Sequence, residues 1–151
     1  MNKLLLDTSV LIDHLRCYGP AIAFLEMVFK GGVPVAVSVV TEMELYAGKS
    51  MQDAAKEEAV RKLLGLFEVL PVTSPIARRA GALLRQYRPQ GLTPTDAIIA
   101  ATVLEEGATL VTRNIRDFRA VEGLLIFDLP DLSTNKGVRR SIIKDLTQRI
   151  R

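Results

Sequence analysis

The stretch Leu4-Leu5-Leu6-Asp7-Thr8-Ser9 decides the class of fold. Three consecutive leucines are typical of a short strand that is buried on both faces, and Asp7 stands where this strand ends. Thr8 or Ser9 is a suitable N-terminal cap for a helix that continues to about Arg16. The stretch therefore predicts a strand that runs directly into a helix, with a carboxylate at the junction.

Strands and helices alternate along the rest of the chain. Further strands are expected at 35–39, 68–72, 109–112 and 124–127. Further helices are expected at 21–30, 41–48, 53–67, 75–87 and 94–106. The expected strands are short, continuous apolar runs, which favours a parallel sheet covered by helices on both faces. The sequence therefore predicts an α/β fold.

The composition is that of a single globular domain. The chain has 151 residues, of which 48% are hydrophobic, and it contains no uninterrupted apolar run long enough to cross a membrane. The apolar run before Asp7 is too short for a signal peptide. Cys17 is the only cysteine, so neither an internal disulfide nor a zinc cluster is expected. We therefore expect a cytoplasmic protein with no membrane partner.

Acidic residues follow several of the expected strands. Ligands of open parallel sheets bind at the carboxyl ends of the strands, so Asp7, Glu44 and the segment 114–117 should meet at one edge of the sheet. Asp96 joins them if its helix packs beside them. Carboxylates that are brought together repel one another unless a hard divalent cation such as Mg²⁺ or Mn²⁺ binds between them. The pattern therefore favours a metal site.

Other catalytic groups are scarce in this sequence. His14 is the only histidine, and there is neither a GxxxxGK[ST] phosphate loop nor a GxSxG nucleophile turn. A site without a histidine base can activate water by coordinating it to a metal ion, which lowers the pKa of the water. The residues thus favour metal-dependent hydrolysis.

Each acid also has a purely local interpretation. Asp7 fits the N-terminal cap of a helix. Glu44 stands three residues after Thr41, and Asp96 follows a threonine at the same spacing, so both fit a capping box. Asp96, however, begins a nearly continuous apolar stretch at 97–101. Such a stretch predicts a buried helix, and a carboxylate at its end needs a partner.

Four segments resemble, in order and spacing, the motifs of the PIN domain family (named for the PilT N-terminus). They are Leu5-Leu6-Asp7-Thr8-Ser9-Val10-Leu11-Ile12-Asp13, Ser38-Val39-Val40-Thr41-Glu42-Met43-Glu44-Leu45-Tyr46-Ala47-Gly48, Thr95-Asp96-Ala97-Ile98-Ile99-Ala100-Ala101-Thr102 and Leu110-Val111-Thr112-Arg113-Asn114-Ile115-Arg116-Asp117-Phe118. No single segment is specific, but the four together span roughly residues 3–129. The resemblance is closest to the VapC-type toxins of bacterial and archaeal toxin–antitoxin pairs.

The resemblance implies both a fold and an activity. The fold is a three-layer α/β/α sandwich with a central, mainly parallel sheet, and it is commonly homodimeric. The activity is Mg²⁺-dependent cleavage of RNA phosphodiester bonds by a metal-activated water, with Mn²⁺ able to replace Mg²⁺. A VapC-type toxin would also have a cognate antitoxin as its partner. The alternative is a PIN-like module that binds nucleic acid with weak or no catalysis.

The resemblance also implies roles for single residues. Asp7, Glu44 and Asp96 fall on acidic positions of the family and would be catalytic and metal-binding. Many relatives carry Asp where this chain has Asn114, and others rely on the acid before Phe, here Asp117, so we assign Asp117 as the weaker fourth acid. The residues expected to support these acids are Ser9, Thr112 and Asn114. Arg113 and Arg116 are expected to position the RNA backbone, although a solvated surface is the competing interpretation for both.

Two other families also place an aspartate after the first strand. A phosphatase of the haloacid-dehalogenase type needs a second aspartate two positions on, where this chain has Ser9. A receiver-type signalling module needs acids before the end of the first strand, and Met1-Asn2-Lys3 offers none. Both families are therefore disfavoured.

A basic tail follows the end of the resemblance near Pro130. Residues 133–151 contain six basic residues and one acidic residue and carry a net charge of +5, so residues 1–132 carry −2 of the chain's total of +3. We expect a PIN-like nuclease domain at 1–132 and a helical tail at 133–151, with an apolar stripe formed by Val138, Ile142, Ile143, Leu146 and Ile150. The tail either docks on the domain or is disordered, or it contacts RNA phosphates or an acidic antitoxin.

Overall fold

The central element of the fold is a parallel sheet of five strands. The structure, a computed structural model, describes residues 3–129. The strands are β1 (Leu4–Leu6), β2 (Val35–Ser38), β3 (Glu68–Leu70), β4 (Thr109–Thr112) and β5 (Ile126–Asp128). Their order across the sheet is β3-β2-β1-β4-β5, and every neighbouring pair is parallel. β1 is therefore the middle strand, and Asp7 follows it directly.

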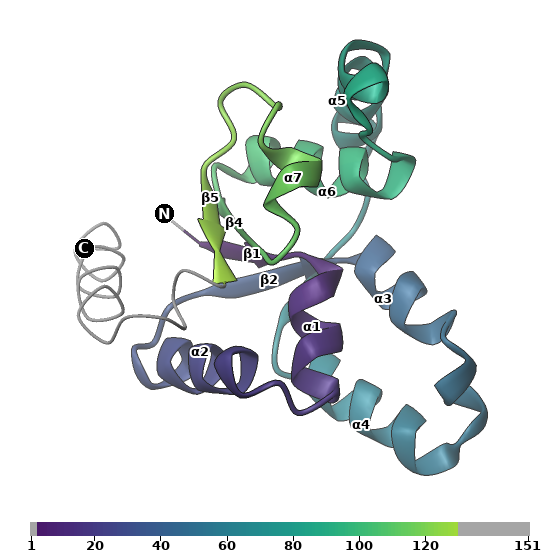
Figure 1. Ribbon diagram of the computed structural model, residues 1–151, viewed down its shortest axis with the longest axis vertical. Coiled ribbons are helices and arrows are strands. Elements are labelled where there is room, and N and C mark those ends of the chain that lie inside the picture. Colours follow the sequence, from purple (N-terminus) through teal and green to yellow (C-terminus); the bar gives the residue numbers. More distant parts are fainter. Residues whose placement is uncertain (1–2, 130–151) are drawn as a thin grey trace.

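Helices cover both faces of this sheet. They are α1 (Thr8–Leu15), α2 (Gly19–Lys30), α3 (Val39–Tyr46), α4 (Ala54–Leu64), α5 (Ser74–Tyr87), α6 (Pro94–Glu106) and α7 (Ile115–Phe118), with short 3₁₀ turns η1 (Lys49–Gln52) and η2 (Arg88–Gln90). In Figure 1, α1, α2 and α4 lie below the sheet, whereas α5, α6 and α7 lie above it. The expected three-layer α/β/α sandwich is confirmed.

The three leucines of β1 divide between two hydrophobic cores. Leu4 and Leu6 pack in the core that contains the buried residues of α1, α2 and α4, and Leu5 packs in the core formed with α5 and α6. All three are almost fully buried. Because successive side chains of a strand point to opposite faces, a run of apolar residues is what a strand in the middle layer requires. Burial of each leucine contributes about 2 kcal/mol.

Helix α3 begins earlier than the sequence pattern indicated. The Ser38 hydroxyl accepts a hydrogen bond of 3.1 Å from the Val40 backbone N–H and so caps the helix. Thr41 consequently lies inside the helix, where it is fully buried. The capping box of Thr41 and Glu44 is therefore wrong, and the Glu44 side chain is available for other contacts. The short helix α7 was not expected at all.

Helix α6 begins and ends where expected. The Thr93 hydroxyl accepts a hydrogen bond of 3.3 Å from the Asp96 backbone N–H, and Gly107 ends the helix with a positive φ of 60°. Buried residues follow Asp96 in the helix, as the apolar pattern predicted. The cap holds Asp96 in the first turn, at the end of the helix nearest the carboxyl ends of the strands.

The predicted tail and the predicted absence of a membrane span differ in what the structure says of them. The tail at 133–151 lies outside the described residues, so the boundary between domain and tail stays a prediction. Within residues 3–129, no helix is long and apolar enough to span a membrane.

Candidate functional site

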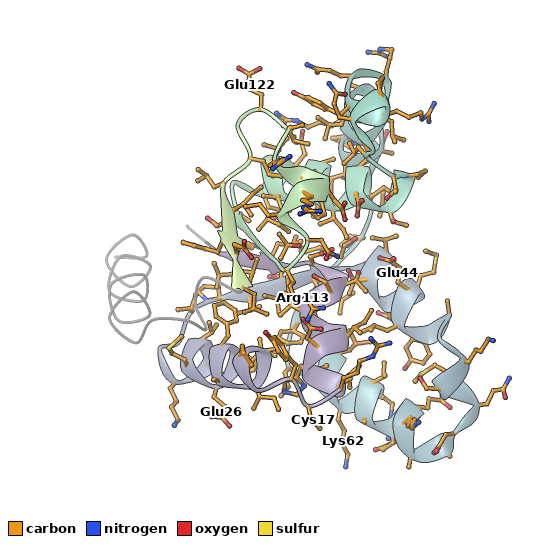
Figure 2. The ribbon with its side chains drawn as sticks, viewed as in Figure 1. Cys17, Glu26, Glu44, Lys62, Arg113 and Glu122 are labelled. Atoms are coloured by element: carbon orange, nitrogen blue, oxygen red, sulfur yellow. The ribbon has the colours of Figure 1, made fainter. Side chains whose placement is uncertain are left out.

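A cavity of about 270 Å³ opens at the carboxyl ends of the strands. Its walls come from one side of α1 along its whole length, from α3, from the first turn of α6 and from the loop after β4. The lining residues are Asp7, Thr8, Ser9, Ile12, Asp13, Arg16, Glu44, Asp96, Arg113 and Asn114. In Figure 2, Arg113 and Glu44 lie on either side of the start of α1. The structure thus brings Asp7, Glu44 and Asp96 to one place from three separate parts of the chain.

Asp7 is the most deeply buried of these acids, with 4% of its surface exposed. It occupies the N-cap position of α1, yet its side chain makes no capping hydrogen bond. Its Oδ2 instead accepts hydrogen bonds of 2.8 Å from the hydroxyls of Ser9 and Thr112. Burial raises the pKa of Asp7, and these two hydrogen bonds oppose that rise because they stabilise the ionised form. The local interpretation of Asp7 as the N-cap residue is therefore confirmed for its position, although its side chain contacts Ser9 and Thr112 instead of capping the helix.

Glu44 is held by a pair of threonine hydroxyls. Thr8 donates a hydrogen bond of 2.7 Å to Glu44 Oε1, and the hydroxyls of Thr8 and Thr41 lie 2.9 Å apart. A hydroxyl can donate only one hydrogen bond. Because Thr8 donates to Glu44, it must accept the hydrogen bond that Thr41 donates. The chain of donors therefore runs from Thr41 through Thr8 to Glu44.

The pKa of Asp96 is raised by its surroundings in the cavity. Its pKa is raised from 3.8 to about 6, first because of burial and then because of the negative charges of Asp7 and Asp117, against a lowering effect of the Thr93 hydroxyl. Like charges raise the pKa of a carboxyl group only when they lie close to it. The charges of Asp7 and Asp117 therefore oppose ionisation of Asp96.

Asn114 and Asp117 are the two candidates for the fourth position of the acidic site, and they lie in different places. Asn114 lines the cavity and its backbone N–H donates a hydrogen bond of 2.9 Å to the Thr112 hydroxyl. Asp117 lies on α7, is exposed and is not among the lining residues, although its charge acts on Asp96. Thr112 therefore links Asn114 to Asp7, as expected of a supporting residue.

The two arginines that were expected to bind RNA differ in position. Arg113 lines the cavity, forms an ion pair of 3.3 Å with Asp13 and lies over the ring of Tyr18. Arg116 is exposed on α7 and is not among the lining residues. Of the two, only Arg113 faces the acids.

The residue types that line the cavity suit a metal ion, but their side chains are not arranged around a common point. Within residues 3–129, no three acidic, histidine or cysteine side chains are arranged to hold an ion. The Glu44 carboxylate accepts the Thr8 hydroxyl instead. The donors are nevertheless carboxylate and amide oxygens, which Mg²⁺ prefers, and the repulsion that raises the pKa of Asp96 is what a cation would relieve. The donor set fits Mg²⁺, and the side chains would have to adjust to bind it.

Three residues in or next to the cavity, Thr8, Thr41 and Asp13, had no expected role in the site. Thr8 and Thr41 were interpreted as helix caps, and Asp13 was given no role. Asp13 is in fact buried and lines the cavity. Its place four residues after Ser9, on the same helix, was the available signal, since residues three or four positions apart share a helix face.

The sequence matches a known family over most of its length. The model of the PIN domain family matches residues 4–124. The chain belongs to the PIN domain family. Among curated PIN-type relatives, the protein named Ribonuclease VapC10 of Mycobacterium tuberculosis is 42% identical over 125 residues, which cover 80% of this chain and 90% of that protein.

Solved structures give the same assignment for the fold of this PIN domain. A toxin–antitoxin complex from Klebsiella pneumoniae contains a chain that is 31% identical, with a TM-score of 0.69, over 84% of this chain and 98% of that chain. DNA-bound VapBC from Salmonella typhimurium contains a chain that is 25% identical, with a TM-score of 0.75, over 85% of this chain and 99% of that chain.

Proposed function

We propose that this PIN domain is a Mg²⁺-dependent endoribonuclease and the toxin of a VapBC-type toxin–antitoxin pair. The observation that carries the proposal is that Asp7, Glu44 and Asp96 line one cavity and that mutual repulsion contributes to raising the pKa of Asp96 to about 6. The relative named Ribonuclease VapC10 supports the activity, and the toxin–antitoxin complex from Klebsiella pneumoniae supports the biological context.

In this proposal the acids share one task, which is to bind a divalent cation. Asp7, Glu44 and Asp96 bind the cation, and Asp117 or Asn114 completes its surroundings. When bound, Mg²⁺ or Mn²⁺ would offset the charge of the scissile phosphate and lower the pKa of the attacking water.

The hydroxyl groups around these acids keep them in place. Ser9 and Thr112 orient the Asp7 carboxylate, and Thr8 orients Glu44. The described residues that line the cavity include no histidine and no lysine. The carboxylates are therefore the groups through which the protein itself acts on water and cation.

Cleavage of a labelled, structured RNA by the purified protein tests the activity. We expect cleavage with Mg²⁺, loss of cleavage with EDTA and recovery when Mg²⁺ is restored. Asp7→Asn and Asp96→Asn should reduce the rate by at least about 100-fold, because each removes a charge from the site. Glu122→Gln is the matched control, since Figure 2 shows Glu122 in a loop far from Arg113 and Glu44.

The main alternative is a PIN-like module that binds nucleic acid without cutting it. This alternative predicts RNA binding with no product under any divalent cation. Full activity of Asp7→Asn or Asp96→Asn would instead contradict the assignment of the acids.

The proposal extends to partners and location. We propose a homodimer that pairs with a cognate antitoxin in the cytoplasm. Light scattering on the protein, alone and with the product of any small gene found directly upstream of its own, tests the dimer and the pair. A protein that stays monomeric and does not bind that product would contradict both the dimer and the pairing.

A further inference from the structure

Arg113 is held from two sides at the edge of the acidic cavity. One guanidinium nitrogen lies 3.3 Å from Asp13 Oδ1, and the guanidinium carbon lies 5.4 Å from the centre of the Tyr18 ring. The side chain of Arg113 is still 45% exposed. The guanidinium group therefore has a fixed position and keeps donors that face solvent.

Asp13 is an unusual partner because it is buried. Its side chain is 9% exposed, and its Oδ2 is buried with no hydrogen-bond partner among residues 3–129. A buried carboxylate is costly unless it is fully paired, and a hydrophobic residue at such a position is often as stable or more stable. Stability alone therefore does not account for an aspartate at this position.

The end of α1 places Tyr18 beside this ion pair. Cys17 has a positive φ of 60°, and the backbone N–H of Tyr18 donates a hydrogen bond of 2.9 Å to the carbonyl of Asp13. The N–H of Cys17 donates a hydrogen bond of 3.0 Å to the carbonyl of His14. These two bonds form the helix end known as the Schellman motif, in which glycine usually occupies the left-handed position. The same residue, Asp13, thus holds Arg113 through its side chain and Tyr18 through its backbone.

An anchored arginine in a cavity of carboxylates suits a phosphate group. The cavity acids repel RNA, and Arg113 supplies positive charge beside them. The planar guanidinium group binds phosphate with two parallel hydrogen bonds, and an arginine that is already ordered loses less freedom on binding.

We propose that Asp13 and Tyr18 are positioning residues that hold Arg113 in place to bind a phosphate of the RNA strand at the edge of the acidic cavity. This inference rests on the proposed ribonuclease function and adds residues to it. Asp13 could also have the opposite effect on RNA binding. If it only neutralised the charge of Arg113, it would weaken the binding of RNA. The two roles predict opposite effects of removing the Asp13 charge.

Binding of a fluorescein-labelled, mixed-sequence single-stranded RNA, measured by fluorescence anisotropy in EDTA, separates these roles. Asp13→Asn keeps the size of the side chain and should raise the Kd about fivefold, because Arg113 is then no longer fixed. Arg113→Lys keeps the charge but loses the planar fork and should raise the Kd by a similar factor of about five. A Kd that falls or stays unchanged in Asp13→Asn would overturn the proposal.

A double variant tests whether Asp13 acts through Arg113. Adding Asp13→Asn to Arg113→Lys should cost little further affinity, since residues that act as a unit are not additive. If the increase in Kd of the double variant equals the product of the increases in the two single variants, the proposal is contradicted. Glu105→Gln is the matched control, because it removes the carboxylate 2.9 Å from Arg79, whose side chain is also 45% exposed but does not line the cavity.

Cleavage kinetics with Mg²⁺ distinguish positioning from a general loss of structure. Both single variants should raise KM more than they lower kcat, with unfolding temperatures close to that of the wild type. If the wild type cuts RNA and Asp13→Asn behaves identically, this inference fails and the proposed function stands. If the wild type neither binds nor cuts RNA, the proposed function fails and the inference fails with it.

Discussion

The Thr112 hydroxyl donates a hydrogen bond of 2.8 Å to Asp7 Oδ2, although the two residues are 105 positions apart in the chain. The bond joins the carboxyl ends of β4 and β1, which are neighbours in the sheet. It directs the Asp7 carboxylate away from a capping role and toward the cavity. The orientation of this acid therefore depends on a hydroxyl that only the folded sheet brings near.

Replacement of Thr112 by valine should impair cleavage without unfolding the domain. The change removes one of the two hydroxyl donors that oppose the effect of burial, so the pKa of Asp7 should rise further. Because the carboxylate form is needed to bind a cation, the acidic limb of the pH–rate profile should move to higher pH. The rate at neutral pH should fall about tenfold, as expected for loss of a hydrogen bond to a charged group.

The same substitution at Thr109 provides the control. Thr109 is also buried in β4 but lies at the opposite end of the strand. Identical pH–rate profiles for Thr112→Val and Thr109→Val would contradict a role for the Thr112 hydroxyl.

Asp96→Asn should stabilise the protein in the absence of metal while it removes activity. The pKa of Asp96 is about 6 in the folded chain and near 3.8 when unperturbed, so the folded state binds the proton more tightly. The wild type in EDTA should therefore lose stability as pH rises through this interval, and the asparagine variant should lose less. At neutral pH we expect the Tm of the variant to be higher by roughly 2–4 °C.

Thermal unfolding in EDTA across this pH range measures the effect. The difference in Tm should disappear below the ordinary pKa of aspartate, where both proteins are uncharged at this position. Mg²⁺ should raise the Tm of the wild type more than that of the variant, because a ligand stabilises only the state that binds it. A variant that is less stable than the wild type at every pH would refute the repulsion inferred for Asp96.

The hydroxyl chain to Glu44 should tolerate serine and fail with valine. Thr8→Val removes the donor to Glu44 and leaves the Thr41 hydroxyl without its acceptor, so the cleavage rate should fall about tenfold. Thr8→Ser retains the hydroxyl and should retain most of the activity. Rates measured side by side for the two variants give the answer, and equal losses in both would show that the methyl group of Thr8 matters more than its hydroxyl.

Asn114→Asp should tighten metal binding, whereas Asp117→Asn should have a smaller effect. Asn114 lines the cavity, so aspartate there adds a charge directly beside the other acids. Asp117 acts from outside the lining, and its removal should lower the pKa of Asp96. Calorimetric titration of the wild type and both variants with Mg²⁺ measures the three dissociation constants. If Asn114→Asp binds Mg²⁺ no more tightly than the wild type, or if Asp117→Asn changes the dissociation constant more than Asn114→Asp does, the prediction is contradicted.

Local sequence patterns were sufficient for most of the fold. Leu4–Leu6 predicted the middle strand, and Thr93 predicted the start of α6, because apolar runs and caps act over a few residues. The start of α3 was wrong by two residues, since Ser38 could not be distinguished from the end of a strand. The four-residue helix α7 is too short to produce a periodic pattern.

The site was predicted less completely than the fold. Asp7, Glu44 and Asp96 were expected to converge because each follows a strand or begins a helix at the same edge of the sheet. The partners of these acids depend on side-chain directions that sequence spacing does not give, as the contacts of Thr8 with Glu44 and Thr41 demonstrate. Asp13 was missed because its role arises from Arg113, which lies 100 positions away.

Titration of Mn²⁺ into the protein, followed by electron paramagnetic resonance, tests the claim that Asp7, Glu44 and Asp96 share one divalent cation. The wild type should bind one tightly held Mn²⁺ per chain, Mg²⁺ should displace it, and Asp7→Asn, Glu44→Gln and Asp96→Asn should each weaken the binding by at least about tenfold. Equal Mn²⁺ binding in all four proteins, or none in the wild type, would contradict a shared metal site.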